Sequence, residues 1–280
     1  MTTILDLIKH IKGDVITQDH PDYAKAIARW ACGAEKRAVA VVFVKDESDV
    51  VETLSYARGH SLPVAIRGGG HNPTGASSVE AGVVIDLSRY LNEVQVDPAK
   101  KLVYVGGGAL WRAVDKATAE HDLATVGGTT GVGGLILGGG FGWLSGEHGL
   151  AVDNLVQVTI VSADGTVYTA SETENPDLLF GVRGGGCNFG VVTEFVLALY
   201  PQRKTVFAGP VIFTGDKLKS LAEVSKDWYA KAGKKEAIAL MTTCDPNGNP
   251  VVVCNLFFNG SEEEGRSVYQ KFYNIGWPAG

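Results

Sequence analysis

Residues 63–72 read PVAIRGGGHN, and this stretch sets the fold of the first half of the chain. Residues 63–66 form a short apolar run that is typical of a buried strand, and they lead directly into three glycines and a histidine. Upstream, residues 37–44 (RAVAVVFV) form another apolar run. Between the two runs, residues 48–57 have apolar side chains at helical spacing, with Ser48 as the expected N-cap. Strand, helix and strand in this order predict the start of a βαβ unit that ends in a glycine loop.

Turn signals divide the rest of the first two hundred residues into hairpins and helices. Two short apolar runs flank Asp97-Pro98, and two longer ones flank Asp164-Gly165, a dipeptide that strongly favours a hairpin. The expected strands are 83–87, 94–96, 102–105, 155–162, 166–170 and 191–199, and the expected helices are 5–12, 22–31, 109–121 and 176–182. These elements predict an α+β fold with mixed sheets.

The pattern changes after residue 204. Strands are expected at 206–213, 238–243 and 251–258, and helices at 217–232 and 262–274, the last one capped by Ser261. We therefore divide the chain into a first domain of residues 1–204, with its core at 37–204, and an incomplete second domain of residues 205–280.

Composition argues against several classes of function. The net charge is −6 and no run of five basic residues occurs, so a nucleic-acid surface is not expected. The N-terminus has charged residues within its apolar ones, and no run reaches transmembrane length, so we expect no membrane partner. The missing signal-peptide core favours a cytoplasmic protein and leaves secretion open. The four cysteines form no CxxC pair, so we expect no metal site and favour free thiols over a disulfide.

The 36 glycines gather in clusters, among them 68–70, 133–134, 138–140 and 184–186. Neither the phosphate-loop motif nor a GxGxxG fingerprint after the first strand is present. Glycine loops without lysine suit a dinucleotide whose diphosphate is bound by backbone N–H groups at close range. For any single cluster, however, a tight turn is the simpler explanation.

His71 differs from the other five histidines because it closes a glycine loop at the end of a buried strand. A single histidine is more often structural or solvated. A neutral imidazole is nonetheless a nucleophile, and beside an electrophilic flavin methyl group it could form a stable bond.

Four linked motifs resemble the FAD-linked oxidases of the vanillyl-alcohol oxidase superfamily, in the berberine-bridge-enzyme-like branch. The motifs are AIRGGGHN at 65–72, TTGVGGLILGGGFGWL at 129–144, HGLAVDN at 148–154 and RGGGCNFGVVT at 183–193. Their order and spacing match the family across about residues 37–204. The resemblance implies a PCMH-type FAD-binding domain of two α/β subdomains, followed by a partial α+β substrate domain.

The resemblance also implies the residues of the cofactor site. His71 is the expected covalent link to FAD, and no second link is expected, because Gly127 stands where bicovalent members have a cysteine; Cys187 lies in another motif and is no substitute. The other cofactor-binding residues carried over by position are Arg67, Gly68, Gly69, Gly70, Asn72, Pro73, Thr129, Thr130, Gly131, Gly133, Gly134, Gly139, Gly140, Phe141, Gly142, Ala151, Asn154, Val191 and Val192.

The activity implied by the resemblance is that of a FAD-dependent oxidase acting on an alcohol, sugar or amine, with dioxygen as the acceptor. No catalytic base can be assigned; Tyr104 and Asp115 are better explained as structural residues. Family members continue well past residue 280, so we expect a C-terminally truncated chain with exposed apolar residues at 251–253 and 256–258. Two alternatives remain at this point: a catalytically impaired remnant of such an oxidase, and a non-covalent flavin subunit that passes electrons to a partner chain.

Overall fold

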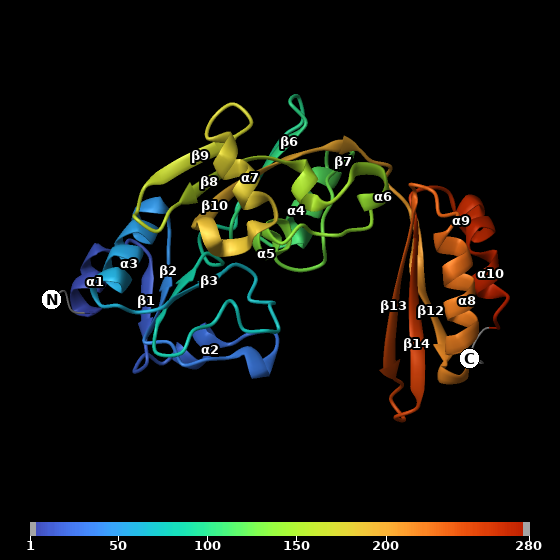
Figure 1. The fold of residues 1–280 in the computed structure, drawn as a ribbon, viewed down its shortest axis with the longest axis horizontal. Coiled ribbons are helices and arrows are strands. Elements are labelled where there is room, and N and C mark those ends of the chain that lie inside the picture. Colours follow the sequence, from blue (N-terminus) through green and yellow to red (C-terminus); the bar gives the residue numbers. More distant parts are fainter. Residues whose placement is uncertain (1–3, 277–280) are drawn as a thin grey trace. The chain divides into compact units, whose positions relative to one another are not determined.

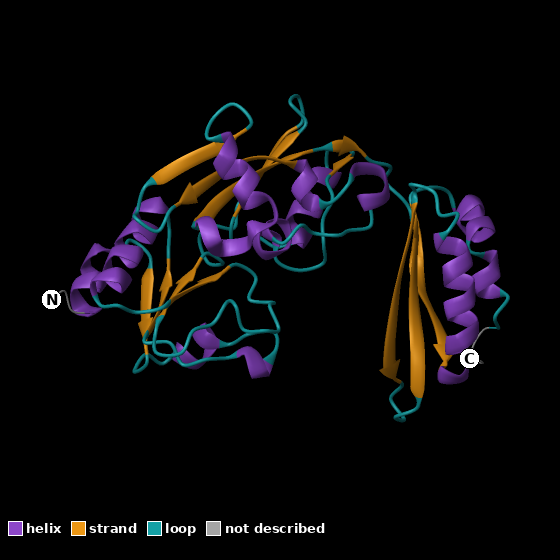
Figure 2. Cartoon of the chain, viewed as in Figure 1, coloured by secondary structure: helices purple, strands orange, loops and turns teal. Residues whose placement is uncertain are grey.

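The computed structural model describes residues 4–276, which form two compact units. Within the described residues, one unit comprises 4–142 with Leu150–Pro201, and the other comprises Trp143–Gly149 with 202–276. Helices and strands are mixed in both units, as Figures 1 and 2 show, so the predicted α+β fold class is confirmed. No helix between Ile4 and Gly276 is long and apolar enough to cross a bilayer.

The first sheet of the larger unit contains the predicted βαβ start. Its strands are β1 (Asp14–Thr17), β2 (Ala40–Phe43), β3 (Val64–Arg67) and β4 (Val83–Asp86), in the order β1-β2-β4-β3. Strands β2, β4 and β3 are parallel, and β1 is antiparallel to β2. The crossover helix α3 (Glu47–Gly59) and α1 (Ile4–His10) pack on one face, and α2 (Tyr23–Ile27) packs on the other. Both faces are therefore covered, which explains why β2 and β4 are apolar throughout.

The N-cap of α3 is Asp46, so the prediction of Ser48 is wrong. The Asp46 carboxylate accepts hydrogen bonds from the backbone N–H groups of Ser48 (3.0 Å) and Asp49 (3.3 Å). Ser48 is the second residue of the helix, and its hydroxyl also donates to Asp46. A carboxylate at this position satisfies two of the free N–H groups and interacts well with the helix dipole.

The second sheet of the larger unit is antiparallel, with the order β5-β6-β10-β8-β9. It contains both predicted hairpins, one formed by β5 (Val94–Asp97) and β6 (Leu102–Gly106), the other by β8 (Leu155–Val161) and β9 (Val167–Ser171), and β10 (Val191–Ala198) lies between them. The other elements of this part are η1 (Cys32–Ala34), α4 (Trp111–Ala119), β7 (Leu123–Ala124), α5 (Val132–Leu137), η2 (Ala151–Asn154), α7 (Pro176–Gly185), η3 (Gly186–Phe189) and β11 (Tyr200–Pro201).

One apolar cluster joins the two sheets of the larger unit. Val161 and Val191, at the ends of β8 and β10, pack in the same cluster as Val42, Ile85 and Val50 of the first sheet and its helix. A hydrogen bond of 2.6 Å from the Thr193 hydroxyl to the Glu47 carboxylate lies at the same junction. Because this cluster is shared, the first sheet and the adjoining ends of β8 and β10 form one core.

The smaller unit is a three-stranded antiparallel sheet with helices on one face (Figure 2). Its elements are α6 (Ser145–His148), β12 (Phe207–Thr214), η4 (Gly215–Lys217), α8 (Leu218–Tyr229), β13 (Glu236–Cys244), β14 (Pro250–Phe258), α9 (Glu262–Val268) and α10 (Gln270–Tyr273), with the strand order β12-β14-β13. Ser261 caps α9 as predicted, through a capping box with Glu264. The predicted helix 262–274 is interrupted at Tyr269, whose hydroxyl donates to the Phe257 carbonyl at 2.5 Å.

The expected exposure of apolar residues on β14 is largely wrong. Val252, Leu256 and Phe258 are buried under the helices. Phe257, on the opposite face, is also buried and stacks on Trp143 with the ring centroids 5.5 Å apart. The helices thus cover the face that the sequence pattern left without a partner.

Candidate functional site

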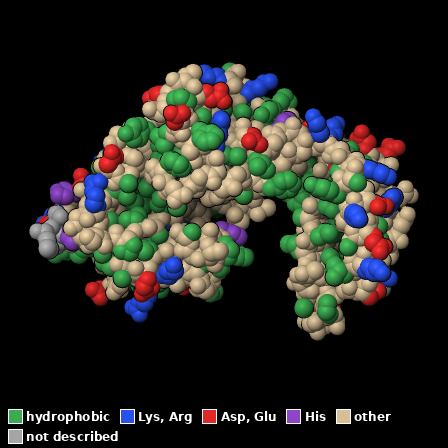
Figure 3. Space-filling view, viewed as in Figure 1, with side chains coloured by type: hydrophobic (Ala, Val, Ile, Leu, Met, Phe, Trp, Pro, Cys, Tyr) green, Lys and Arg blue, Asp and Glu red, His purple; other side chains and the backbone are tan. Residues whose placement is uncertain are grey.

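A cavity of about 420 Å³ lies in the larger unit beside the glycine loop that follows β3. Segments from four parts of the chain contribute most of its wall: residues 66–77, residues 130–138 with the helix α5, residues 186–190 and the strand β10. Glycine predominates in the first three segments. In Figure 3 few charged side chains border the hollow on this face of the larger unit, so backbone and small side chains form much of its surface.

The structure brings half of the predicted cofactor residues to the wall of this cavity, and the other half do not line it. The wall includes Gly68, Gly69, Gly70, His71, Asn72, Thr130, Gly131, Gly133, Gly134 and Val192. The residues that do not line it are Arg67, Pro73, Thr129, Gly139, Gly140, Phe141, Gly142, Ala151, Asn154 and Val191. The two glycine loops that the sequence analysis singled out therefore face one cavity, with Gly138 as the last lining residue of the second loop.

Several of the lining glycines serve close packing between backbones. A Cβ atom on Gly69 would lie 2.8 Å from Gly131 Cα, and one on Gly68 would lie 2.9 Å from the Gly107 carbonyl oxygen. Side chains at these positions would push the loops apart, so close approach of the backbones accounts for these two glycines without any ligand. Gly134 is different, because a Cβ there would meet no atom within 4 Å. It leaves open a space on the cavity wall where a ligand can approach the N-terminal turn of α5.

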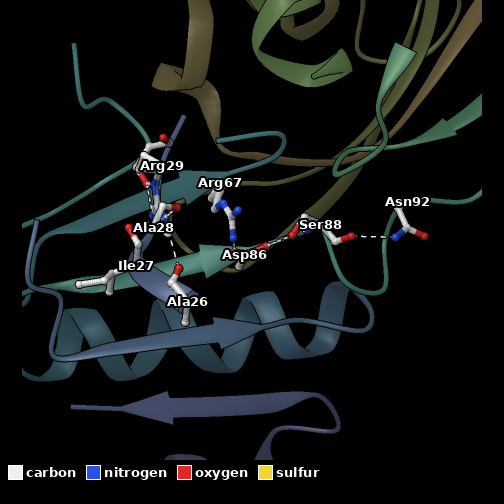
Figure 4. Close-up of polar contacts among 9 residues, drawn as sticks. Ala26, Ile27, Ala28, Arg29, Arg67, Asp86, Ser88 and Asn92 are labelled. Atoms are coloured by element: carbon white, nitrogen blue, oxygen red, sulfur yellow. Dashed lines mark hydrogen bonds and ion pairs between the residues drawn. The ribbon is translucent and has the colours of Figure 1, made fainter. Parts of the chain in front are cut away.

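Arg67, the last residue of β3, stabilises the first glycine loop. Its guanidinium pairs with the fully buried Asp86 carboxylate at 2.5 Å, and the other Asp86 oxygen accepts from the Ser88 backbone N–H at 2.9 Å (Figure 4). A Cβ on Gly70, which has φ +66°, would lie 2.7 Å from Arg67 Nε. Arg67 thus ties the end of β3 to β4 and fixes the turn above it.

Asn72 shapes the loop that follows His71. Its side-chain oxygen accepts hydrogen bonds from the backbone N–H groups of Thr74 (2.9 Å) and Ala76 (3.3 Å) and from the Thr74 hydroxyl (2.7 Å). This Asx-type turn orders residues 72–76 without any ligand. His71 itself is half-buried on the cavity wall, and its ring stacks on Trp30 with the centroids 4.2 Å apart.

Ser77 is a lining residue that the sequence reasoning missed. Its exposed fraction is 7%, and its hydroxyl has no hydrogen-bond partner among the described residues. A buried hydroxyl without a partner is costly unless a ligand or water satisfies it. The group therefore suits a polar ligand in the cavity. A lone serine in a loop carries no periodicity or motif signal that would have identified it.

The Ser77 backbone is held by Arg29. The carbonyl oxygen of Ser77 accepts from Arg29 Nε at 3.1 Å and from Nη2 at 2.7 Å. Burial, together with the nearby charge of Arg67, lowers the pKa of Arg29 to about 10, so its guanidinium remains charged at neutral pH.

The motif at 148–154 supports α5 rather than lining the cavity. The backbone N–H of Ala151 donates to the Gly140 carbonyl at 2.7 Å. The Asp153 carboxylate accepts from the Leu150 N–H at 2.7 Å, and the Asn154 amide donates to the Leu150 carbonyl at 2.7 Å. These hydrogen bonds order the turn at residues 150–154. Phe141, another predicted cofactor residue, does not line the cavity and is 67% exposed.

Cys187 is the second lining residue that the sequence reasoning did not place here. It belongs to η3 and shares the cavity wall with His71, and its thiol is exposed. The structure shows no disulfide among the four cysteines, of which Cys254 alone is buried. Tyr104 and Asp115, the two weighed as catalytic bases, are not among the lining residues.

Comparison with known proteins identifies relatives of both units. Residues 38–171 match the FAD binding domain family. The FAD-linked oxidoreductase pgmH of Aspergillus terreus is 36% identical over 285 residues, which cover 98% of this chain and 57% of the relative. The (R)-6-hydroxynicotine oxidase of Paenarthrobacter nicotinovorans is 36% identical over 202 residues, or 71% of this chain and 44% of the relative. The chain thus spans little more than half the length of the first of these relatives.

Solved structures agree with the sequence relatives. The crystal structure of 6-hydroxy-D-nicotine oxidase from Arthrobacter nicotinovorans matches with a TM-score of 0.89 at 30% identity, covering 96% of this chain and 60% of that one. The BBE-like 1 protein of Physcomitrella patens matches with a TM-score of 0.87 at 22% identity, covering 99% of this chain and 61% of that one. The second match shows a shared fold.

Proposed function

Because the chain belongs, through its FAD-binding domain, to the vanillyl-alcohol oxidase superfamily of FAD-linked oxidoreductases, we propose that the cavity holds FAD and that the whole protein is a FAD-dependent oxidase. The observation that carries this proposal is the meeting of the two glycine loops, Gly68–Asn72 and 130–138, on the wall of one cavity. Such loops present backbone N–H groups to a diphosphate with no side chains in the way.

The residues of the cavity fit a dinucleotide with a large aromatic ring. Gly134 leaves space at the N-terminal turn of α5, and the buried Ser77 hydroxyl can donate to or accept from the bound cofactor. Leu87, Leu135 and Phe195 add apolar wall. When bound, FAD supplies the group that accepts a hydride from the substrate. The chain itself would bind the cofactor, orient it and limit its contact with water.

His71 would attach the flavin covalently, with FAD bound through this single link. Its place on the cavity wall at the end of the first glycine loop supports this assignment. A neutral imidazole nitrogen is a competent nucleophile. We assign cofactor contact to the lining residues, and support of the glycine loops to Arg67, Ala151 and Asn154.

The substrate would be a small molecule with an oxidisable C–H beside an oxygen or nitrogen, such as an alcohol, a sugar or an amine, and the acceptor would be dioxygen. The similar proteins include a hydroxynicotine oxidase and, at 26% identity, a carbohydrate oxidase from Microdochium nivale. The names of these relatives favour a working oxidase over a catalytically impaired remnant.

A spectroscopic titration tests this function. The purified protein is expected to show the flavin absorption bands, to lose them when an oxidisable alcohol, sugar or amine is added without oxygen, and to regain them with release of hydrogen peroxide when air is admitted. Matched samples with a redox-inert analogue of each compound provide the control. A protein that binds no FAD at micromolar concentrations would contradict the proposal at its first step. A flavin that is reduced but reoxidised only by another electron acceptor would contradict the oxidase assignment alone.

A further inference from the structure

Two adjacent residues, Arg29 and Trp30, hold the loop that carries His71 at both of its ends. We call residues 70–77 the histidine loop. The Trp30 backbone N–H donates to the Gly70 carbonyl at 3.2 Å, at the start of this loop. Arg29 binds the Ser77 carbonyl at the other end through two nitrogens, at 3.1 and 2.7 Å. Residues 29 and 30 follow α2, which is more than forty positions away from Ser77 in the sequence.

Arg29 is anchored firmly enough to serve as a fixed point. Its exposed fraction is 7%, and Nη1 donates to the carbonyl oxygens of Ile27 at 3.0 Å and Ala28 at 2.8 Å, as drawn in Figure 4. The planar guanidinium thus donates at the same time to carbonyl groups at the end of α2 and to the carbonyl group of Ser77. The backbone of Trp30 is fixed as a consequence, since it directly follows Arg29.

The Trp30 side chain lies on the His71 ring. The two ring centroids are 4.2 Å apart and the planes are inclined by 25°, which is a stacked arrangement. The Trp30 side chain is 66% exposed, so burial in the core does not account for its position. Among the described residues, neither nitrogen of the His71 ring has a hydrogen-bond partner, so the stack is the contact that orients the imidazole and leaves its nitrogens available.

We propose that Trp30 is a positioning residue for covalent flavin attachment: its indole holds the His71 imidazole in the orientation that the attachment needs, and Arg29 fixes the loop beneath it. This inference rests on the proposed function. Attachment breaks one C–H bond of a flavin methyl group and the imidazole N–H bond and forms a C–N bond. The two electrons and two protons released reduce dioxygen to hydrogen peroxide. The rate of such a step depends steeply on the angle and distance of the attacking nitrogen.

Reconstitution of the apoprotein measures this positioning directly. Protein made under riboflavin starvation is mixed with FAD, and acid-stable flavin is followed over time. We expect Trp30→Ala to slow attachment by ~10-fold or more, while the dissociation constant for FAD before attachment and the thermal midpoint change little. Trp30→Phe keeps an aromatic face on the imidazole and should restore most of the rate. A matched control is Tyr56→Ala, which removes a second aromatic–histidine contact, the tilted pair of Tyr56 and His60 with ring centroids 4.2 Å apart, away from the cavity.

A measurement without FAD distinguishes positioning from a general loss of structure. In the wild-type apoprotein, the ring protons of His71 should show an upfield ring-current shift in proton NMR spectra, which Trp30→Phe should keep in part and Trp30→Ala should abolish. Equal attachment rates for wild type and Trp30→Ala would overturn the inference and leave the proposed function intact. A wild-type protein that never acquires acid-stable flavin would contradict the proposed covalent link and this inference with it.

Discussion

The indole ring of Trp111 fills the space that a side chain at residue 127 would need. A Cβ atom on Gly127 would lie 2.6 Å from Trp111 Cε3, and Trp111 is completely buried in α4. The resemblance implies that Gly127 stands where bicovalent members of the family have a cysteine, and the structure leaves no room for a side chain at this position. The buried Trp111 indole therefore also bears on the number of flavin links.

From this contact we predict that Gly127→Cys gives a less stable protein with no second flavin link. Forcing a side chain against a buried indole costs about 1–3 kcal/mol. The matched control is Gly33→Cys, because a Cβ on Gly33 meets no atom within 4 Å. Thermal unfolding and peptide mapping provide the readouts. A peptide of the Gly127→Cys variant that carries flavin on the introduced thiol would contradict the prediction.

A pair of alanine substitutions should separate loop packing from cofactor contact. Gly69→Ala places a Cβ 2.8 Å from Gly131 Cα and should lower the free energy of unfolding by about 1–3 kcal/mol. Gly134→Ala meets nothing in the protein and lies inside α5, so it should leave stability unchanged or raise it by up to ~1 kcal/mol.

The affinity for FAD should respond differently to the second substitution. The new methyl group of Gly134→Ala would enter the cavity, so binding should weaken although the fold is intact. Both variants are best measured by calorimetry in the His71→Ala background, where binding is reversible. If Gly134→Ala bound FAD as tightly as its parent, the cofactor would not approach α5.

The exposed thiol of Cys187 reports whether the cavity is filled. FAD in the cavity should reduce maleimide labelling of Cys187 several-fold, because a ligand enclosed by the cavity wall blocks the reagent from the residues that line it. Cys32 and Cys244 are also exposed and do not line the cavity, so their labelling should stay constant. Mass spectrometry of the labelled peptides gives all three values in one sample. Unchanged labelling of Cys187 at saturating FAD would place the cofactor elsewhere.

The cap of α3 should make the larger unit sensitive to acid. Burial raises the pKa of Asp46, but the hydrogen bonds from Lys12 and Ser48 outweigh it and lower the pKa to about 2. Since the folded pKa lies below the unfolded value, the stabilisation is complete at neutral pH and is lost as the pH falls from about 4 towards 2.

Two variants of Asp46 separate the cap from its charge. Asp46→Ala removes the cap and should cost about 0.5–2 kcal/mol at neutral pH. Asp46→Asn keeps the cap but loses the titration, so its urea midpoint should converge on that of wild type as the pH falls through the range in which Asp46 titrates. A difference that stays constant over this range would contradict the role of the carboxylate charge.

Local sequence signals were sufficient for most elements of the fold. Strands β2, β3 and β4 were recognisable from short apolar runs, and the hairpin of β8 and β9 from the Asp164-Gly165 turn, because each signal lies within a few neighbouring residues. By contrast, β1 (DVIT) was missed because only its pairing with β2 makes it a strand. The helix α5 was hidden because two of its six residues are glycines, which intrinsic propensity disfavours.

The site was predictable only where a motif marked it. The loops at 68–72 and 131–142 were expected to face a common ligand. The first loop and residues 131–138 of the second share a cavity, whereas residues 139–142 do not line it. Ser77 reaches the same wall through the turn set by Asn72, which no local pattern encodes. Cys187 belongs to the motif at 183–193, but that motif did not assign the cysteine to the cofactor site. The contact of Trp30 with His71 spans forty-one positions and depends on where α2 ends.

Acid precipitation of the purified protein tests the central claim most directly. Wild-type protein should retain yellow flavin in the denatured pellet, and proteolysis should place it on the peptide that contains His71. The His71→Ala variant should bind FAD in its native form and release all of it on denaturation. Flavin that remains in the acid-washed pellet of His71→Ala, or a wild-type pellet that is colourless after the protein was purified yellow, would contradict the account.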